Sequence, residues 1–361
     1  MEIRNKYHKT IGFFLMAFAL TIIATFSYAT TNMDVTVKEI YFNYEDGNTN
    51  DALTISNDGD SIINHAEWDS NYGETHKFAY IKEQSNRKIK VRFNAGSYSG
   101  VMHLLIKISY DYYDDGIGTI CNLFIPNFDI STNDSQILTL NGALPNSVGV
   151  HRFDWEWEIY AIPVNNSNYC AAWSSTFTTH HFFTVLAAPQ APMEQPWERV
   201  LDYACDWASG QASEYYIISQ ITEKAYENIG KQYSGAGTHA VVPNFNLTAF
   251  FSDNWADCRD MSAIVQVFSN ALGVQNIQVR RINGQFVYKP ILPVGIISWK
   301  YGKWNFHQIG YYNNVFDACL KLNLDSPRIP IDEPINGIYK TDLFDSGSWT
   351  PINATRYTYV N

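Results

Sequence analysis

The sequence lacks several features that mark common functional classes. After its first thirty residues no segment is apolar enough to cross a membrane. Lysine and arginine number 25 against 36 aspartates and glutamates, which gives a formal net charge of −11. An acidic surface disfavours nucleic acid and anionic lipid as partners. The glycine-rich stretch at 234–245 lacks the Gly-Lys-Ser/Thr ending of a phosphate-binding loop, which predicts an ordinary loop.

Cysteine is also scarce, with five residues in the chain. An odd number leaves at least one thiol unpaired. Apart from Cys258, the cysteines divide two and two between the halves of the chain, which predicts the disulfides Cys121–Cys170 and Cys205–Cys319. A buried free thiol is the alternative for Cys205, because it falls on the apolar face of a predicted helix.

The chain opens with a basic and then apolar leader. Three basic residues precede an uncharged apolar run from Ile11 to Phe26, and Ser27-Tyr28-Ala29 follows. This pattern predicts a signal peptide over residues 1–29, cleaved after Ala29, with an uncleaved anchor as the alternative. We therefore expect an exported protein, periplasmic or secreted, with no integral membrane segment after cleavage. Its net charge would be near −13, because the leader contributes +2.

Residues 30–188 alternate between apolar and polar side chains with the period of two of half-buried strands. The clearest runs are Ile89–Phe93, Met102–Tyr112 and Phe153–Ile159, and turn-rich stretches separate the strands. The pattern predicts an antiparallel β-sandwich, loosely immunoglobulin-like. Trp155 and Trp157 could form a sugar-stacking platform, but aromatic residues on the apolar side of a strand more often belong to the core.

The sequence predicts no metal site and no organic cofactor. His180 and His181 are adjacent, yet no Cys, His or carboxylate stands near them at a recognisable ligand spacing. We expect both histidines to be exposed at a strand end.

A proline-rich linker at 189–196 separates this region from a second domain over 197–324. Two amphipathic helices are expected there, from Trp197 to Ala208 and from about Ser213 to Ile229, each ended by a glycine. Asn283–Gly284 between two apolar segments predicts a hairpin turn. Helices followed by a small antiparallel sheet give an α+β, papain-like layout. The extension at 325–361 is a lid, a brace or a disordered tail.

Cys258 stands where a third helix should begin. Apolar residues recur at three- and four-residue steps from Met261 to Leu272, and Gly273 ends the pattern. Asp257 is a good N-cap, so the Cys258 sulfur would lie beside the first turn. Unpaired N–H groups and the helix dipole favour a thiolate there. A buried structural cysteine or half of a disulfide is the alternative.

His307 and Asp317 follow on two short predicted strands around Asn313–Asn314. A cysteine opening a helix with a Leu-Gly-aliphatic stop, then a histidine on one strand and an aspartate on the next, resembles the transglutaminase-like core of papain-like cysteine enzymes. The resemblance covers roughly Pro196 to Leu324. It departs at Ala256, where members often have glycine, and at Gln308–Ile309, where Ala-Trp often follows the histidine.

The resemblance implies acyl transfer through a thioester. Cys258 would attack a carboxamide or peptide carbonyl, His307 would accept and return the proton, and Asp317 would orient the imidazole. Peptide or protein substrates are implied, cell-wall peptide among them, and the acceptor decides between protease, amidase and transglutaminase. Trp255 and Trp304 are candidate oxyanion donors beside the Cys258 N–H, with core packing as the alternative. An inactive exported binding or structural module remains open.

The triad requires His307 and Asp317 to face the same side of the sheet. A simple two-residue turn at Asn313–Asn314 would pair Gly310 with Asp317 and place the two side chains on opposite faces. The chemistry therefore predicts an odd offset that pairs Asp317 with Ile309 or Tyr311.

Overall fold

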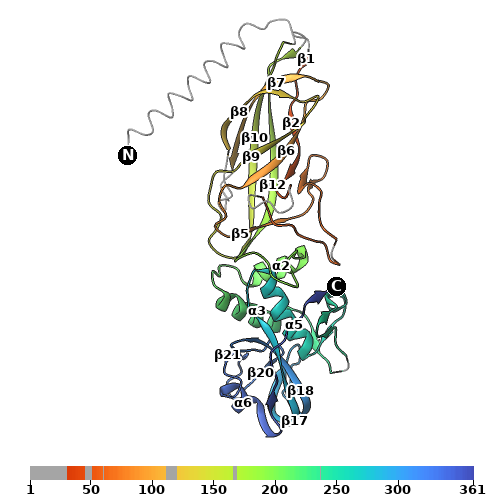
Figure 1. Ribbon diagram of the computed structural model, residues 1–361, viewed down its shortest axis with the longest axis vertical. Helices are drawn as coiled ribbons and strands as arrows, with labels where there is room; N and C mark the ends of the chain where they lie inside the picture. Colours follow the sequence, from red (N-terminus) through yellow and green to blue (C-terminus); the bar gives the residue numbers. More distant parts are fainter. Residues whose placement is uncertain (1–30, 45–50, 60, 111–119, 166–168, 236) are drawn as a thin grey trace, which may run out of the picture.

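The computed structural model describes residues 31–44, 51–59, 61–110, 120–165, 169–235 and 237–361. The predicted leader and its cleavage site lie outside these residues. The chain is a β-rich, multi-domain protein with several sheets. An N-terminal part built of strands and a C-terminal part with both helices and strands follow each other along the long axis of the molecule (Figure 1).

Two five-stranded sheets form most of the N-terminal part. The first has the order β5 (Phe78–Ile81), β12 (Ala172–Val185), β10 (Gly149–Pro163), β7 (Val101–Tyr110) and β8 (Ile120–Asp129). The second has the order β4 (Gly73–Glu74), β3 (Trp68–Asp69), β2 (Thr36–Tyr41), β6 (Lys88–Asn94) and β9 (Ser135–Thr139). Pairing within them is antiparallel except between β5 and β12. A short parallel pair joins β1 (Thr31–Asn32) to β11 (Tyr169–Cys170).

The inner faces of these two sheets share one apolar core. Trp155 and Trp157 are both fully buried, as the alternation of β10 predicts, so they are core residues. The prediction for His180 is wrong, because its side chain is also fully buried and stacks on Phe153. It lies on the inner face of β12, where the period of two places every second side chain. His181 points the other way and pairs with Glu74 at 2.7 Å. It is half-buried and lies within β12, so the expectation of an exposed strand-end residue is wrong for it as well.

The C-terminal part packs helices against a second set of strands. The helices are α2 (Glu198–Trp207), α3 (Glu214–Asn228), α4 (Leu247–Ser252), α5 (Cys258–Ala271) and α6 (Ile338–Leu343). The main sheet has the order β20 (Leu320–Lys321), β17 (Gln278–Pro293), β18 (Lys300–Tyr312), β19 (Asn314–Phe316) and β21 (Ile331–Glu333). Two smaller sheets pair β13 (Gln232–Tyr233) with β16 (Trp255–Ala256), and β15 (Asn244–Phe245) with both β14 (Ala240–Val241) and β24 (Tyr359–Val360).

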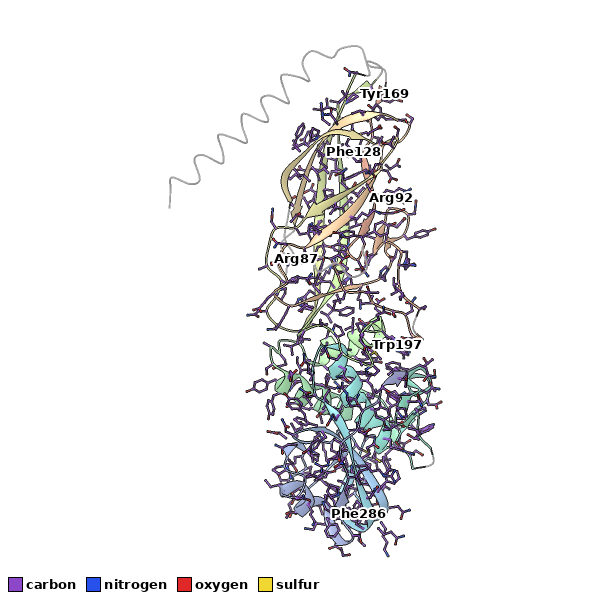
Figure 2. All side chains as sticks on the ribbon, in the orientation of Figure 1. Arg87, Arg92, Phe128, Tyr169, Trp197 and Phe286 are labelled. Carbon is purple, nitrogen blue, oxygen red and sulfur yellow. The ribbon has the colours of Figure 1, made fainter. Side chains whose placement is uncertain are left out.

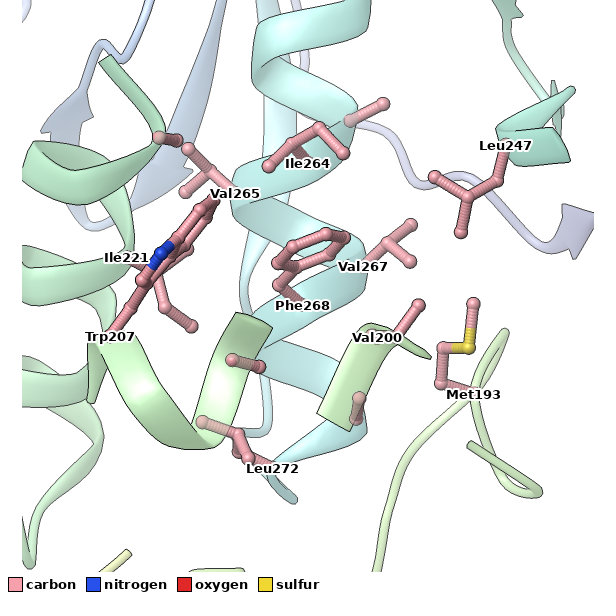
Figure 3. Close-up of a cluster of buried hydrophobic side chains, with 14 of the residues drawn as sticks. Met193, Val200, Trp207, Ile221, Leu247, Ile264, Val265, Val267, Phe268 and Leu272 are labelled. Carbon is pink, nitrogen blue, oxygen red and sulfur yellow. The ribbon is translucent and has the colours of Figure 1, made fainter. Parts of the chain in front are cut away.

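Helix α5 lies at the centre of this part. Its side chains from Met261 to Ala271 are buried all round, because α2 and α3 cover one side and the sheet the other. Figure 3 shows Phe268 and Val265 facing Val200 and Ile221 of the neighbouring helices. Gly310 of β18 allows close contact on the sheet side, since a Cβ there would approach Val265 to 2.9 Å. The helix that begins at Cys258 is therefore fixed against β18.

The predicted hairpin at Asn283–Gly284 is wrong. Strand β17 runs through both residues, and only a bulge interrupts its pairing with β18. Gly284 has φ of +125°, and a Cβ there would approach the Ser348 carbonyl oxygen to 2.3 Å. Because Gly284 has no side chain, the backbone just before β23 (Thr350–Pro351) can approach it closely. Strand β23 pairs with β17. Long-range pairing overrides the local turn preference.

The segment between the two parts is packed against both. The Ser56 N–H donates to the Pro196 carbonyl at 3.0 Å, and the Leu186 N–H donates to the Leu272 carbonyl at 3.0 Å. Trp197 is buried at the narrow junction of the two parts (Figure 2). One apolar cluster continues from Val185 through Trp197 into the helices. The proline-rich segment at 189–196 is therefore a packed connection between the two parts.

The C-terminal extension is a brace. Strands β22 (Phe344–Gly347) and β23 both pair with β17, and β24 pairs with β15. Tyr357 is fully buried against α5, where its backbone N–H donates to the Gln266 side chain at 3.0 Å. The last residues thus complete the C-terminal part.

The predicted Cys205–Cys319 disulfide is wrong, because both thiols are free. Cys205 lies on the buried face of α2, where its Sγ approaches the Thr184 carbonyl at 3.8 Å. The side chains of Cys121 and Cys170 lie outside the described residues. No helix in the described part of the chain is long and apolar enough to span a membrane.

Candidate active site

Cys258 opens α5 behind a complete N-terminal cap. The Asp257 carboxylate accepts from the backbone N–H groups of Arg259 at 2.8 Å and Asp260 at 3.1 Å. The Asp260 carboxylate in turn accepts from the Asp257 N–H at 3.0 Å, which completes a reciprocal capping box. Cys258 is 6% exposed. Its thiol therefore lies at the positive end of a rigid helix, beside N–H groups that have no partner within the helix.

His307 and Asp317 form a buried pair. His307 Nε2 lies 2.8 Å from Asp317 Oδ2, and neither residue is more than 1% exposed. The other carboxylate oxygen accepts from the Cys319 N–H at 2.9 Å, and Oδ2 also accepts from the Tyr339 hydroxyl at 2.8 Å. Three hydrogen bonds thus fix the carboxylate against the imidazole.

The strand register produces this pair. Tyr311 pairs with Val315 and Gly310 with Phe316, so continuing the register places Asp317 opposite Ile309. Asn313 turns the chain with φ of +61°, a backbone conformation that asparagine tolerates. The predicted odd offset is confirmed, and with it the shared face of His307 and Asp317.

Cys258 is a neighbour of the same imidazole. Burial disfavours the protonated ring, but the Asp317 carboxylate and then Cys258 outweigh it and raise the pKa of His307 to about 10. Apart from Cys258, His307 Nδ1 has no hydrogen-bond partner among the described residues, which leaves it available to the thiol. The geometry therefore brings together all three side chains that the sequence singled out.

The two tryptophans considered as oxyanion donors pack face to face with histidines. Trp304 stacks on His307, with ring centroids 4.5 Å apart and planes 10° from parallel. Trp255 stacks on His239 at 4.1 Å. The Trp304 ring thereby fixes the tilt of the imidazole, which the Asp317 bond alone would leave free to rotate.

Tyr233 is a site residue that the sequence reasoning missed. Parallel pairing of β13 with β16 places it opposite Ala256, two residues before Cys258. Burial raises the pKa of its phenol, so the hydroxyl stays protonated. A protonated hydroxyl is a hydrogen-bond donor. Its place in the chain was the only signal that the sequence offered, because a strand of two residues is too short to show a periodic pattern.

Asp260 ends the Asp-Cys-x-Asp stretch that begins at Asp257, a feature of the family resemblance to which the sequence alone assigns no role. Its buried carboxylate accepts from the backbone N–H groups of His239 at 2.8 Å and Ala240 at 2.9 Å, and from the Thr238 hydroxyl at 2.9 Å. The loop expected to be plain is therefore tied to the first turn of α5. Aspartate three residues after an N-cap aspartate was the available signal, because that spacing is typical of a capping box.

Gln308, one of the departures from the family pattern, also has a definite place. Its Nε2 donates to Ser262 Oγ at 2.9 Å and lies 2.8 Å from the Tyr357 hydroxyl. It thus connects β18, α5 and the C-terminal brace behind the site. Gln308 therefore supports the packing behind the site and is not part of the His307–Asp317 pair.

Among the residues that the structure describes, no group of three or more His, Cys, Asp or Glu side chains is arranged to hold a metal ion. The site has a thiol at a helix N-terminus, a buried imidazole and a buried carboxylate. These groups are suited to nucleophilic attack by sulfur with proton transfer through the imidazole. The sequence matches no known family model and no curated protein.

Proposed function

We propose that the protein is a transglutaminase-like cysteine enzyme that transfers or hydrolyses acyl groups through a Cys258–His307–Asp317 triad. The observation that carries this proposal is the buried His307–Asp317 pair at 2.8 Å, with Cys258 acting on the same ring. In this reading the N-terminal part is an immunoglobulin-like sandwich and the helices and sheet around α5 are the transglutaminase-like core. The leader makes the protein an exported one.

The proposed reaction begins with transfer of the Cys258 proton to His307 Nδ1. The thiolate attacks the carbonyl carbon of an amide, and the negative oxygen of the tetrahedral intermediate accepts from the Cys258 N–H and the Tyr233 hydroxyl. When the C–N bond breaks, His307 returns the proton to the leaving amine. A thioester remains on Cys258. Water or a second amine then attacks the thioester, gives a proton to His307 and releases the acid or the new amide.

Asp317 acts through His307. Hydrogen bonding to Nε2 keeps Nδ1 directed at the sulfur, and the negative charge stabilises the imidazolium that forms. Because the Tyr339 hydroxyl and the Cys319 N–H hold the carboxylate, little reorganisation is needed during the reaction. Peptide or protein amides, cell-wall peptides included, are the proposed substrates.

The test is alkylation of Cys258 by iodoacetamide between pH 5 and 9, followed by peptide mapping. A thiolate stabilised by imidazolium should react at a rate that changes little across this range, whereas an ordinary thiol has a pKa near ~8.5 and slows tenfold per pH unit below it. His307→Ala should restore the ordinary profile. Burial raises the pKa of Cys205 and Cys319 well above the usual range, so both serve as silent internal controls.

Product analysis then identifies the acceptor. The protein is incubated with peptide mixtures with and without a primary amine, and mass spectrometry searches for hydrolysed or amine-linked products that Cys258→Ala does not form. An ordinary alkylation profile in the unaltered protein would refute the proposal and favour an inactive exported binding module.

A further inference from the structure

The outer face of the first sheet carries two large exposed aromatic side chains. Phe177 is 71% exposed and Trp173 is 54% exposed, both on β12. They point the same way because they are an even number of residues apart, and at ~3.3 Å per residue they are about 13 Å apart along the strand. Figure 1 shows β12 and β10 side by side along the N-terminal part. Both rings lie on a strand of the N-terminal part, whereas Cys258 opens α5 of the C-terminal part.

Polar and aromatic groups on β10 accompany this row. Tyr160 pairs with Trp173, with ring centroids 6.4 Å apart. Glu156 pairs with Phe177, and its carboxylate accepts from the Ser175 hydroxyl at 3.4 Å. An aromatic ring with a carboxylate directly across the strand pair can contact both the apolar and the polar groups of an amphipathic ligand.

A hollow of about 450 Å³ lies beside Phe177. Its lining includes Arg152, Asp154, Glu156 and Thr179. The Asp154 carboxylate accepts from Arg152 at 3.3 Å and from the Thr179 hydroxyl at 2.5 Å, so these polar groups hold one another in place. The volume falls in the range of small-molecule sites.

The charges on this face restrict the chemistry of its ligand. Three carboxylates, those of Asp154, Glu156 and Glu158, stand against the cations Arg152 and Lys107, which pair with Asp154 and Glu158 respectively. Glu156 has no ion-pair partner among the described residues and faces the hollow. The surplus negative charge repels nucleic acid and other anionic polymers. A neutral ligand rich in hydroxyl groups can donate to Glu156 and lay an apolar face on the rings.

We propose that this face binds a neutral oligosaccharide along β12. One sugar ring stacks on Phe177, and its hydroxyl groups donate to Glu156 directly across the strand pair. Another sugar ring stacks on Trp173, with Tyr160 beside it. The separation of about 13 Å leaves room for further sugar units between the two rings. The site is independent of the cysteine chemistry.

Isothermal titration of the full chain with neutral hexasaccharides tests the site, using β-1,4-linked glucose, β-1,4-linked N-acetylglucosamine and β-1,3-linked glucose. At least one should bind with millimolar affinity or better. Trp173→Ala and Phe177→Ala should each weaken binding tenfold or more, and Glu156→Gln should weaken it less. Tyr72→Ala is the matched control, because Tyr72 is 82% exposed in the turn between β3 and β4 of the second sheet and should leave binding unchanged. Cys258→Ala should bind as the unaltered chain does.

Three results would overturn the proposal. One is the absence of binding by all three neutral sugars at millimolar concentration. Another is equal binding of an anionic hexagalacturonate, which the charge argument excludes. The third is self-association in analytical ultracentrifugation that Trp173→Ala abolishes while sugar binding stays the same, since a second copy of the chain would then be the occupant.

Discussion

At the scale of single residues, the charge of Asp317 is what keeps a proton on His307. Asp317→Asn keeps the shape but removes the charge that raises the pKa of His307. The imidazolium would lose a hydrogen bond to a charged group, worth ~1.5–3 kcal/mol, so alkylation of Cys258 at pH 6 should slow about tenfold or more. The measurement is the pH profile of iodoacetamide labelling.

Tyr339→Phe is the matched control for that substitution. It removes the hydroxyl that donates to Asp317 Oδ2 but leaves the carboxylate charge and the aromatic ring. Its labelling profile should stay close to that of the unaltered protein. If Asp317→Asn also kept that profile, Asp317 would have no electrostatic effect on the site.

His180 makes the N-terminal part sensitive to acid. Burial lowers the pKa of His180 to about 3, whereas an unfolded histidine titrates near ~6.5. Between these values the unfolded chain binds a proton that the folded chain excludes, so stability is intact above pH 6.5 and falls as the pH drops toward 3. From pH 6.5 to 5 the loss should be about 2 kcal/mol.

His180→Gln should remove that part of the pH dependence. Urea denaturation at pH 7 and pH 5 measures it, with the exposed His65→Gln as control. An equal loss of stability in His180→Gln and the unaltered protein would mean that other groups cause it.

At the scale of elements, Gly284 supports the pairing of β17 with the C-terminal strands. Gly284→Ala would place a Cβ 2.3 Å from the Ser348 carbonyl oxygen, in a left-handed backbone region. The expected loss of unfolding free energy is about 3 kcal/mol or more. Gly210→Ala is the control, because Gly210 also has positive φ but faces open space, so about 1 kcal/mol is expected. Thermal melts compare the two, and equal costs would contradict the close-approach argument.

The elements also show how far sequence predicts this structure. Amphipathic periodicity predicted α2 and α3 and the long strands, since each buries one regular face. It also predicted where α5 lies, but α5 is buried all round and not on one face alone. The same reasoning predicted the register that joins His307 to Asp317, because chemistry required a shared face. It failed at Asn283–Gly284, where β23 decides the backbone, and at His180, which nothing local marks as buried. In both cases contacts with residues distant in the sequence determine the local structure.

At the scale of the whole molecule, the two parts share one apolar cluster. Val185 at the end of β12 and Trp197 before α2 belong to the same buried group as the helix residues Leu201 and Phe268. The Lys77–Asp202 ion pair and the Ser56–Pro196 backbone bond also cross the junction. Separating the parts would expose this cluster to water, so they should unfold together.

Substitution far from the junction tests this coupling. Ile106 is fully buried in the N-terminal core, and Ile106→Ala should cost about 2–5 kcal/mol. If the parts unfold together, that cost lowers the temperature at which Cys319, buried next to Asp317 inside the C-terminal part, becomes reactive to a thiol reagent. Adding Trp197→Ala opens a cavity at the junction and should separate the two transitions. Unchanged Cys319 reactivity in Ile106→Ala alone would mean that the parts unfold independently, because destabilising one would then leave the other intact.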